Sequence, residues 1–193
     1  MDTIVLASGS PRRRDLLLKY KLRPIIEEPQ IEEKIYLDEA PEQVAMALSF
    51  EKVAQVANKF NNGEIIIGAD TIVACDGLIL GKPKNEYEGK EMIKFLSNRE
   101  HQVITGISIM RSNCNIKIID YESTIVKFRK LSDKKIQKYI ESNEYIDKAG
   151  GYGIQGLGSI LVEYINGCYF NVVGLPIYKL DTLLERYFNI NLL

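Results

Sequence analysis

Hydrophobic residues along the chain occur in two patterns that predict alternating helices and strands. Short uninterrupted apolar runs, such as the two within 64–75, are typical of buried strands. Longer segments repeat apolar residues every three or four positions, which is the period of a helix that buries one face. The predicted strands are 3–7, 24–28, 64–75, 78–80, 102–111, 116–128, 159–165 and 168–173. The predicted helices are 10–21, 41–61, 85–97, 132–142 and 176–188.

Turn signals between these segments predict three β-hairpins. Asp76-Gly77 separates two apolar runs, Ser112-Asn113 joins the two long strands, and Asn166-Gly167 separates the last two strands. A purely parallel sheet cannot contain hairpins. We therefore expect an α/β protein with a mixed twisted sheet and helices on both faces of that sheet.

Helix starts are marked by residues that cap backbone N–H groups. Three such residues stand at the beginning of predicted helices: Ser10, Asn85 and Ser132. Ser10 is followed by Pro11, a residue favoured at the first helical position. No low-complexity linker divides the chain, so we expect a single domain over residues 1–193. That length also accommodates two small lobes around a cleft within the domain.

The charge balance excludes a generally basic nucleic-acid-binding domain, because 25 Lys and Arg face 26 Asp and Glu for a net charge of −1. Three cysteines and one histidine make a disulfide scaffold or a usual zinc site improbable. The N-terminus lacks the features of a signal peptide, and no apolar run approaches the roughly 18 residues of a membrane span. We expect a soluble cytoplasmic protein without a membrane partner or a nucleic acid polymer as partner.

Arginines crowd the start of the first predicted helix, in Ser8-Gly9-Ser10-Pro11-Arg12-Arg13-Arg14. Cations are unfavourable there, because the helix N-terminus is the positive end of the helix dipole. The arrangement becomes favourable if an anion binds, since backbone N–H groups, serine hydroxyls and guanidinium groups all donate hydrogen bonds to phosphate. Solvated arginines on an exposed turn are the alternative.

Two charged residues interrupt apolar patterns. Asp70 lies within the strand 64–75, where a buried carboxylate needs a partner or a metal. One interpretation is a functional carboxylate, which binds a metal or acts as a general base. The alternative is an aspartate that caps a turn at the end of a strand. Lys52 falls on the apolar face of the helix 41–61, where a lysine usually extends its head group to the rim. Lys82 lies on the turn Gly81-Lys82-Pro83 and is uninformative alone.

Two loops add further candidates. The acidic segment 27–33 contains carboxylates that could bind a hard divalent cation, although their spacing does not indicate which. The segment 147–156 is rich in glycine, which either permits close approach to a flat ligand or makes a mobile loop. Its Gln155 carries an amide that could hydrogen-bond to the edge of a base. The lone His101 is interpreted as structural.

Taken together, these segments resemble the Maf family of nucleotide pyrophosphatases, a family first associated with septum formation. The match covers nearly the whole chain, and the order and spacing of its short motifs are specific. The matching segments are Leu6–Arg13, Glu33, Glu51-Lys52, Gly68–Thr71, Gly81–Pro83, Thr105-Gly106, Asp147–Gly150, Tyr152–Gly156 and Val172–Pro176.

The resemblance implies a fold similar to that of the inosine-triphosphate pyrophosphatases and hydrolysis of a nucleoside triphosphate to the monophosphate and pyrophosphate. Asp70 matches the proton acceptor, and Arg12, Thr71 and Gln155 match the positions that mark the dTTP/UTP subfamily. A divalent cation, Mg²⁺ or Mn²⁺, is expected on Glu33 and Asp70. The residues expected at the phosphates are Ser8, Ser10, Arg13, Lys52 and Lys82.

Alternatives remain at this point. A sister subfamily acts on 7-methyl-GTP, and a non-catalytic nucleotide-binding regulator of cell division would use the same phosphate site. A homodimer is expected by family analogy alone. Gly151 and Phe170 depart from the family pattern, where Ala and a small or polar residue are usual.

Overall fold

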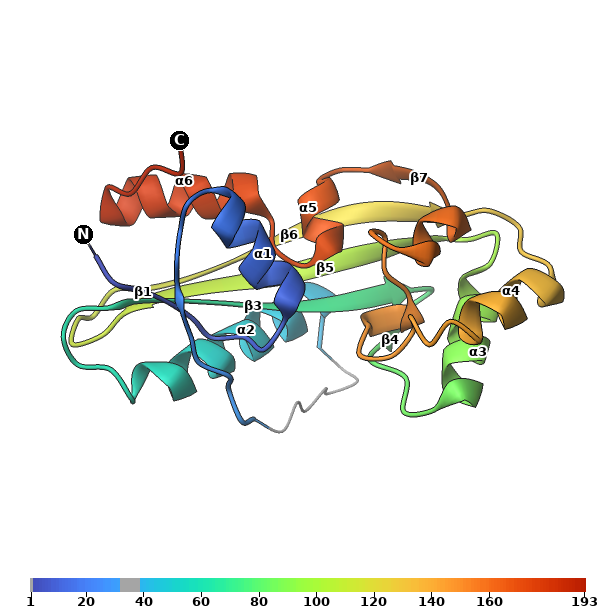
Figure 1. Cartoon of the computed structure of the whole chain (residues 1–193), viewed down its shortest axis with the longest axis horizontal. Coiled ribbons are helices and arrows are strands. Elements are labelled where there is room, and N and C mark those ends of the chain that lie inside the picture. The colour runs from blue at the N-terminus through green and yellow to red at the C-terminus, as the bar shows by residue number, and fades with distance from the viewer. Residues whose placement is uncertain (1, 32–38) are drawn as a thin grey trace. The chain divides into compact units, whose positions relative to one another are not determined.

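The computed structural model describes residues 2–31 and 39–193, and Figure 1 shows the arrangement of its helices and strands. The helices are α1 (Pro11–Lys19), α2 (Pro41–Ala57), α3 (Glu86–Leu96), α4 (Asp133–Ile140), α5 (Tyr169–Val173) and α6 (Ile177–Phe188). The strands are β1 (Ile4–Leu6), β2 (Ile25–Ile26), β3 (Ile65–Cys75), β4 (Leu78–Leu80), β5 (Glu100–Arg111), β6 (Lys117–Phe128) and β7 (Val162–Asn166). Two short 3₁₀ helices, η1 (Ala149–Gly151) and η2 (Leu157–Leu161), precede β7.

The described strands form one mixed sheet, which confirms the predicted α/β class. The strand order is β2-β1-β3-β5-β6-β7, and β4 pairs with β3 outside this path. β1 is parallel to both β2 and β3, and Leu6 stands opposite Ile67. β4 is antiparallel to β3, and β7 is antiparallel to β6. The Asp76-Gly77 hairpin is therefore confirmed.

The chain divides into two compact units, each made of segments that are distant in the sequence. Unit 1 comprises residues 1–70, 105–122 and 174–193, and unit 2 comprises residues 71–104 and 123–173. Two units agree with the two predicted lobes, whereas the cleft between the lobes stays a prediction. The units are described separately below.

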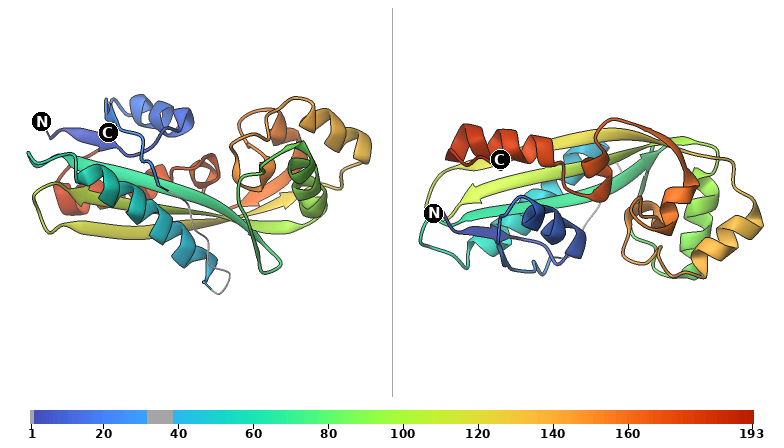
Figure 2. Two further views of the ribbon diagram at one scale, coloured as in Figure 1. Left: turned by 90° about the horizontal axis from the view of Figure 1, so that it is seen from below. Right: turned by 45° about the horizontal axis from the view of Figure 1, so that its top comes forward.

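In unit 1, helices cover both faces of the strands. On one face, Val53 and Val56 of α2 pack against Val5 and Ile66 of the sheet. On the other side of the strands lie α1 and α6, as the two views in Figure 2 show. A Cβ atom on Gly106 of β5 would overlap the main chain of α2, so helix and strand are in close contact there. Helices on both faces are thus confirmed for this unit.

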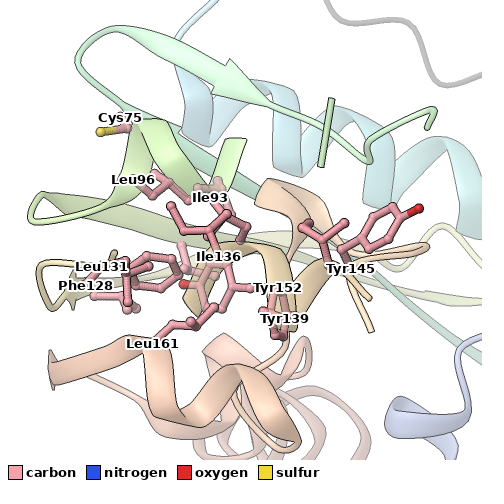
Figure 3. Close-up of a cluster of buried hydrophobic side chains, with 14 residues drawn as sticks. Cys75, Ile93, Leu96, Phe128, Leu131, Ile136, Tyr139, Tyr145, Tyr152 and Leu161 are labelled. Carbon is pink, nitrogen blue, oxygen red and sulfur yellow. The ribbon is translucent and has the colours of Figure 1, made fainter. Parts of the chain in front are cut away.

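The core of unit 2 is a cluster of buried aliphatic and aromatic side chains, shown in Figure 3. Helices α3 and α4 contribute Ile93 and Ile136, and Phe128 of β6 packs edge-on against Tyr152. Burial of this apolar surface is the main source of stability for such a cluster. It also anchors the glycine-rich segment 147–156, because Tyr152 belongs to both.

Helix α5 occupies residues 169–173, so the predicted strand 168–173 and the third predicted hairpin are wrong. Asn171 of α5 is fully buried, and its side-chain amide donates to the main-chain oxygen of Val103 (2.8 Å) and to Oγ1 of Thr124 (2.9 Å). One helical turn places the amide at these acceptors. A short apolar run does not distinguish a strand from such a turn. Phe170 consequently lies on a helix rather than on a strand.

Other boundaries differ from the predictions by several residues. The predicted strand 159–165 begins only at Val162, because the preceding residues form η2. The predicted helix 41–61 ends at Ala57, and the predicted strand 24–28 is reduced to Ile25–Ile26. Element ends are set by local hydrogen bonds that a hydrophobic pattern does not record.

Candidate functional site

The loop after β1 gathers hydrogen-bond donors around Ser8. Ser8 is a buried residue, with 5% of its surface exposed. Its hydroxyl oxygen accepts hydrogen bonds from the main-chain N–H of Ser10 (3.2 Å) and from Nη1 of Arg13 (3.3 Å). A hydroxyl oxygen has two lone pairs and one hydrogen. With both lone pairs engaged, the hydroxyl hydrogen is what Ser8 offers to a ligand, and it suits an anion.

Arg13 also bonds to a distant part of unit 1. Its Nε donates to the main-chain oxygen of Gly174, at 2.7 Å, in the segment that leads into α6. The guanidinium thus joins the loop after β1 to that segment while orienting Ser8. The phosphate contact of Arg13 stays a prediction, and these bonds show in addition that Arg13 shapes the loop.

The start of α1 has the expected electropositive character. Pro11 occupies its first turn with no acidic residue there, and Arg12 is half-buried. Ser10 directly precedes α1, and its side chain makes no capping hydrogen bond to the helix. The first N–H groups of a helix lack partners within the helix. These features are compatible with the predicted anion site at the start of α1, which stays a prediction.

One acidic residue approaches the loop unexpectedly. A Cβ atom on Gly9 would overlap the carboxylate of Glu28, so the main chain of the loop runs against that side chain. The sequence placed Glu28 in the acidic segment without a role. Nothing in the local pattern signals the contact, because it depends on how the strand β2 lies beside β1.

Lys52 and Asp70 form a buried ion pair in unit 1. The Lys52 Nζ contacts Oδ1 of Asp70, and the two side chains are 9% and 7% exposed. The interpretation of Lys52 as a lysine whose head group reaches the rim is therefore wrong. A charge at this depth needs a partner, and each residue supplies one for the other.

The close contact between α2 and the sheet produces this pair. Ser49 Oγ donates to the main-chain oxygen of Met46 (2.8 Å) and lies 2.7 Å from Ser108 Oγ of β5. Gly68 on β3 leaves room for Val53, since a Cβ atom there would overlap the valine side chain. Small residues on the strands thus let α2 approach, and Lys52 reaches Asp70.

Unit 2 holds the candidates Thr71, Lys82 and Gln155. The main-chain N–H of Gly150 donates to the oxygen of Gly81 at 3.0 Å. Gly150, at φ +68°, also lies against the side chain of Val73. Strand β3, the turn of Lys82 and the start of the glycine-rich segment therefore meet within this unit.

His101, interpreted as structural, is buried in unit 2. Its Nε2 lies 2.7 Å from the Tyr152 hydroxyl, and its ring packs edge-on against Phe128. Burial lowers the pKa of His101 to about 4. A neutral, enclosed imidazole at physiological pH agrees with a structural role.

The predicted metal site is only partly described. Glu33 lies outside the described residues, and Asp70 is paired with Lys52 as above. Within residues 2–31 and 39–193, no three His, Cys, Asp or Glu side chains gather as a metal-binding group.

None of the helices in these same ranges is long and apolar enough to cross a membrane.

The described residues define a mixed α/β protein with a donor-rich loop after β1 and a buried lysine–carboxylate pair whose aspartate lies on the neighbouring strand β3. Comparison with known proteins gives its family. The model of the Maf-like protein family matches residues 3–187, and the chain belongs to that family.

Relatives named dTTP/UTP pyrophosphatase match nearly the full chain. That of Clostridioides difficile (strain 630) is 51% identical over 98% of this chain and 97% of its own length. That of Alkaliphilus oremlandii (strain OhILAs) is 47% identical over the whole of both chains. A solved nucleoside-triphosphatase / dITP/XTP pyrophosphatase of Mycobacterium abscessus aligns with a TM-score of 0.42 at 12% identity, over 67% of this chain and 75% of that one.

Proposed function

We propose that this protein is a nucleoside triphosphate pyrophosphatase that hydrolyses dTTP and UTP, and modified pyrimidine nucleotides of the same kind, to the monophosphate and pyrophosphate. The observation that carries the proposal is the buried pair of Lys52 and Asp70, because Asp70 lies on β3, the strand that pairs with β1, and the donor-rich loop follows β1. The names of the relatives supply the substrate class. Removal of such nucleotides is a house-cleaning role.

The triphosphate would be held by groups that donate hydrogen bonds or carry positive charge. Ser8 offers its hydroxyl hydrogen, and Ser10, Arg12 and Arg13 lie at the start of α1, where the first N–H groups lack partners within the helix. Lys52 and Lys82 would neutralise further phosphate charge. An ammonium carries three donors, so the contact of Lys52 with Asp70 is compatible with this role. Such positioning and charge stabilisation is most of what phosphoryl chemistry requires of a protein.

Asp70 would accept the proton of the attacking water. Its position supports the role, because a buried carboxylate has little water to compete for its oxygens. Lys52 balances the charge of this carboxylate. The buried pair thereby keeps a base within an apolar part of the protein at a tolerable cost.

A divalent cation, Mg²⁺ or Mn²⁺, is part of the proposal, with Glu33 and Asp70 as its protein ligands. Carboxylate oxygens are the ligands that both cations prefer, and a carboxylate bonded to lysine through Oδ1 has a second oxygen. When bound, the cation would polarise the phosphate and activate water. Chelation followed by return of each cation tests this part.

Base recognition is assigned to Arg12, Thr71 and Gln155. The Gln155 amide offers both a donor and an acceptor, which the edge of uracil or thymine complements. A wrong base would leave these polar groups unpaired, and that cost produces discrimination. Gln155 is exposed in the structure, as a residue that meets a ligand should be.

Turnover of dTTP, UTP and 7-methyl-GTP, measured by pyrophosphate release with and without Mg²⁺ or Mn²⁺, tests the function. We expect metal-dependent turnover of the two pyrimidine nucleotides. A preference for 7-methyl-GTP would replace the substrate with that of the sister subfamily. Binding without any turnover would favour the nucleotide-binding regulator of cell division.

The role of Asp70 has its own test. Asp70→Asn should abolish pyrophosphate release from dTTP while circular dichroism shows a folded protein. Full activity in a folded variant would refute the assignment of Asp70 as the base.

The setting is also a proposal. We place the protein in the cytoplasm, as a homodimer, acting on nucleotides rather than on nucleic acid polymers. Light scattering on the purified protein and fractionation of cells test the first two points, and a binding assay with single- and double-stranded DNA tests the third.

A further inference from the structure

Glu144 holds the main chain that directly follows Gln155. Its Oε2 accepts from the N–H of Leu157 at 2.7 Å, and its Oε1 accepts from the N–H of Gly158 at 2.9 Å. These are the first two residues of η2, where N–H groups lack partners within the helix. Charge-assisted bonds of this kind are stronger than bonds between neutral groups.

The contact extends to the residue next to Gln155. A Cβ atom on Gly156 would overlap the Glu144 carboxylate, so only a glycine allows the two to approach so closely. Glu144 itself is half-buried and follows α4. Burial first, and the charge of Glu144 second, raise the pKa of the buried Tyr139 beside it, which agrees with a carboxylate at the edge of the core.

The main chain before Gln155 is held as well. Tyr152 is buried in the core of unit 2, and its hydroxyl lies 2.7 Å from Nε2 of His101. A Cβ atom on Gly153 would lie 2.8 Å from Cε of Lys148, whose Nζ bonds to the main-chain oxygen of Glu144. Both sides of Gln155 are therefore fixed, and Glu144 takes part in fixing each.

We propose that Glu144 is a positioning residue that sets base specificity by holding the segment of Gln155 in place. The inference rests on the proposed function, since it assumes that Gln155 meets the base. Gln155 is exposed, and Gly153 and Gly156 flank the pair Ile154-Gln155, so the position of Gln155 depends on the anchors of the main chain. Because Glu144 acts on the base contact alone, its loss should weaken discrimination between bases more than it slows the chemistry.

The test compares UTP with CTP, which differ only in the hydrogen-bonding edge of the base. Glu144→Gln preserves size and keeps one acceptor oxygen, but it replaces the other oxygen with an NH₂ group that cannot accept from an N–H group. We expect the ratio of kcat/KM for UTP over CTP to fall about tenfold, mainly through a higher KM for UTP, with kcat changed less than twofold. The matched control is Glu141→Gln, an exposed residue at the end of the same helix, which should keep the wild-type ratio.

A double-mutant cycle separates positioning from a general structural effect. If Glu144 acts through Gln155, then Glu144→Gln in a Gln155→Ala background should leave the UTP/CTP ratio where Gln155→Ala alone puts it. Additive losses would overturn the inference, as would an unchanged ratio in Glu144→Gln.

A readout independent of turnover is the hydrogen exchange of the Leu157 and Gly158 amides. We expect protection of both amides in the wild type and its loss in Glu144→Gln, but not in Glu141→Gln. Equal protection in the three proteins would overturn the inference. If the wild type itself shows no preference for UTP over CTP in turnover or binding, the proposed function fails first. A wild-type preference that survives in Glu144→Gln refutes only the role of Glu144.

Discussion

The ammonium group of Lys52 on α2 contacts the carboxylate of Asp70 on β3, and less than one tenth of either side chain is exposed. Two charges are thereby taken out of water together. The attraction between them offsets the cost of desolvation only while both are present. The pair therefore couples the predicted catalytic carboxylate to the stability of unit 1.

Replacement of one partner should be costly. Lys52→Met leaves a buried carboxylate without its ammonium, and we expect a loss of about 3–5 kcal/mol in the free energy of unfolding at pH 7. Urea denaturation measures it. Lys59→Met is the matched control, because Lys59 forms an ion pair with Glu27 in which half of the lysine side chain is exposed. That exposed pair should contribute about 1 kcal/mol or less.

The double variant Lys52→Met/Asp70→Asn should regain much of the lost stability, since no unpaired charge stays buried. It should nevertheless be inactive, because the base is absent. Equal stability of Lys52→Met and Lys59→Met would show that Asp70 is not confined to the buried position.

Arg13 should matter more than its neighbour Arg14. The Arg13 guanidinium bonds to Gly174 and to Ser8 at once, and a lysine cannot reproduce that geometry. We expect Arg13→Lys to cost about 1–3 kcal/mol of stability and to raise the KM for nucleotide by loosening Ser8. Arg14→Lys changes an exposed residue that pairs with Asp15, and stability should stay within about 0.5 kcal/mol. Similar losses in both variants, measured by urea denaturation, would contradict this account.

The fold could be predicted where local sequence signals, such as capping residues and turn dipeptides, determine the structure. The capping residues Asn85 and Ser132 accept bonds from the N–H groups of Glu88 and Lys135, as their positions indicated. Long apolar runs and the Asp76-Gly77 turn gave the strands of the sheet. The prediction for the segment of α5 was wrong because this helix depends on the buried amide of Asn171. That amide donates hydrogen bonds to β5 and β6, and such a tertiary contact has no local sequence pattern.

The candidate site divides in the same way. The loop from Ser8 to Arg13 could be recognised because its donors are adjacent in the sequence. The pairing of Lys52 with Asp70 could not, since it arises where a helix crosses a strand and small residues let the two approach. The hold of Glu144 on the segment after Gln155 is also invisible in the sequence, because a carboxylate that binds main-chain N–H groups leaves no characteristic partner residue.

The contact between α2 and the sheet should be sensitive to a single methyl group. Gly106→Ala places a Cβ atom against the main chain at Ala45 and Met46, which cannot rotate away as a side chain would. We expect a loss of about 3 kcal/mol or more, or failure to fold, because packing against main chain is not relieved by a rotamer change. Gly81→Ala is the control for stability, since no atom lies within 4 Å of its added Cβ atom. Equal denaturation midpoints for the two variants would refute the close contact.

Stability should depend on pH through His101. Burial lowers the pKa of His101 from 6.5 to about 4 in the folded protein, so between these values the unfolded chain binds a proton that the folded chain does not. Stability therefore falls as the pH falls from 6.5 toward 4, by at most about 1.4 kcal/mol per pH unit from this group. At pH values well above 6.5 the imidazole is neutral in both states and contributes no pH dependence.

The variant His101→Gln removes the titrating group while keeping a polar side chain beside the Tyr152 hydroxyl. Carboxylates also titrate in the lower part of this window, so the informative quantity is the difference in slope between wild type and variant. Urea denaturation at pH 7.0, 6.0 and 5.0 measures it. The variant should start less stable at pH 7.0, because a buried contact has changed, but its stability should fall less steeply toward pH 5.0. Parallel slopes would mean that His101 exchanges protons equally well in the folded and unfolded states, which is incompatible with its burial against Phe128 and Tyr152.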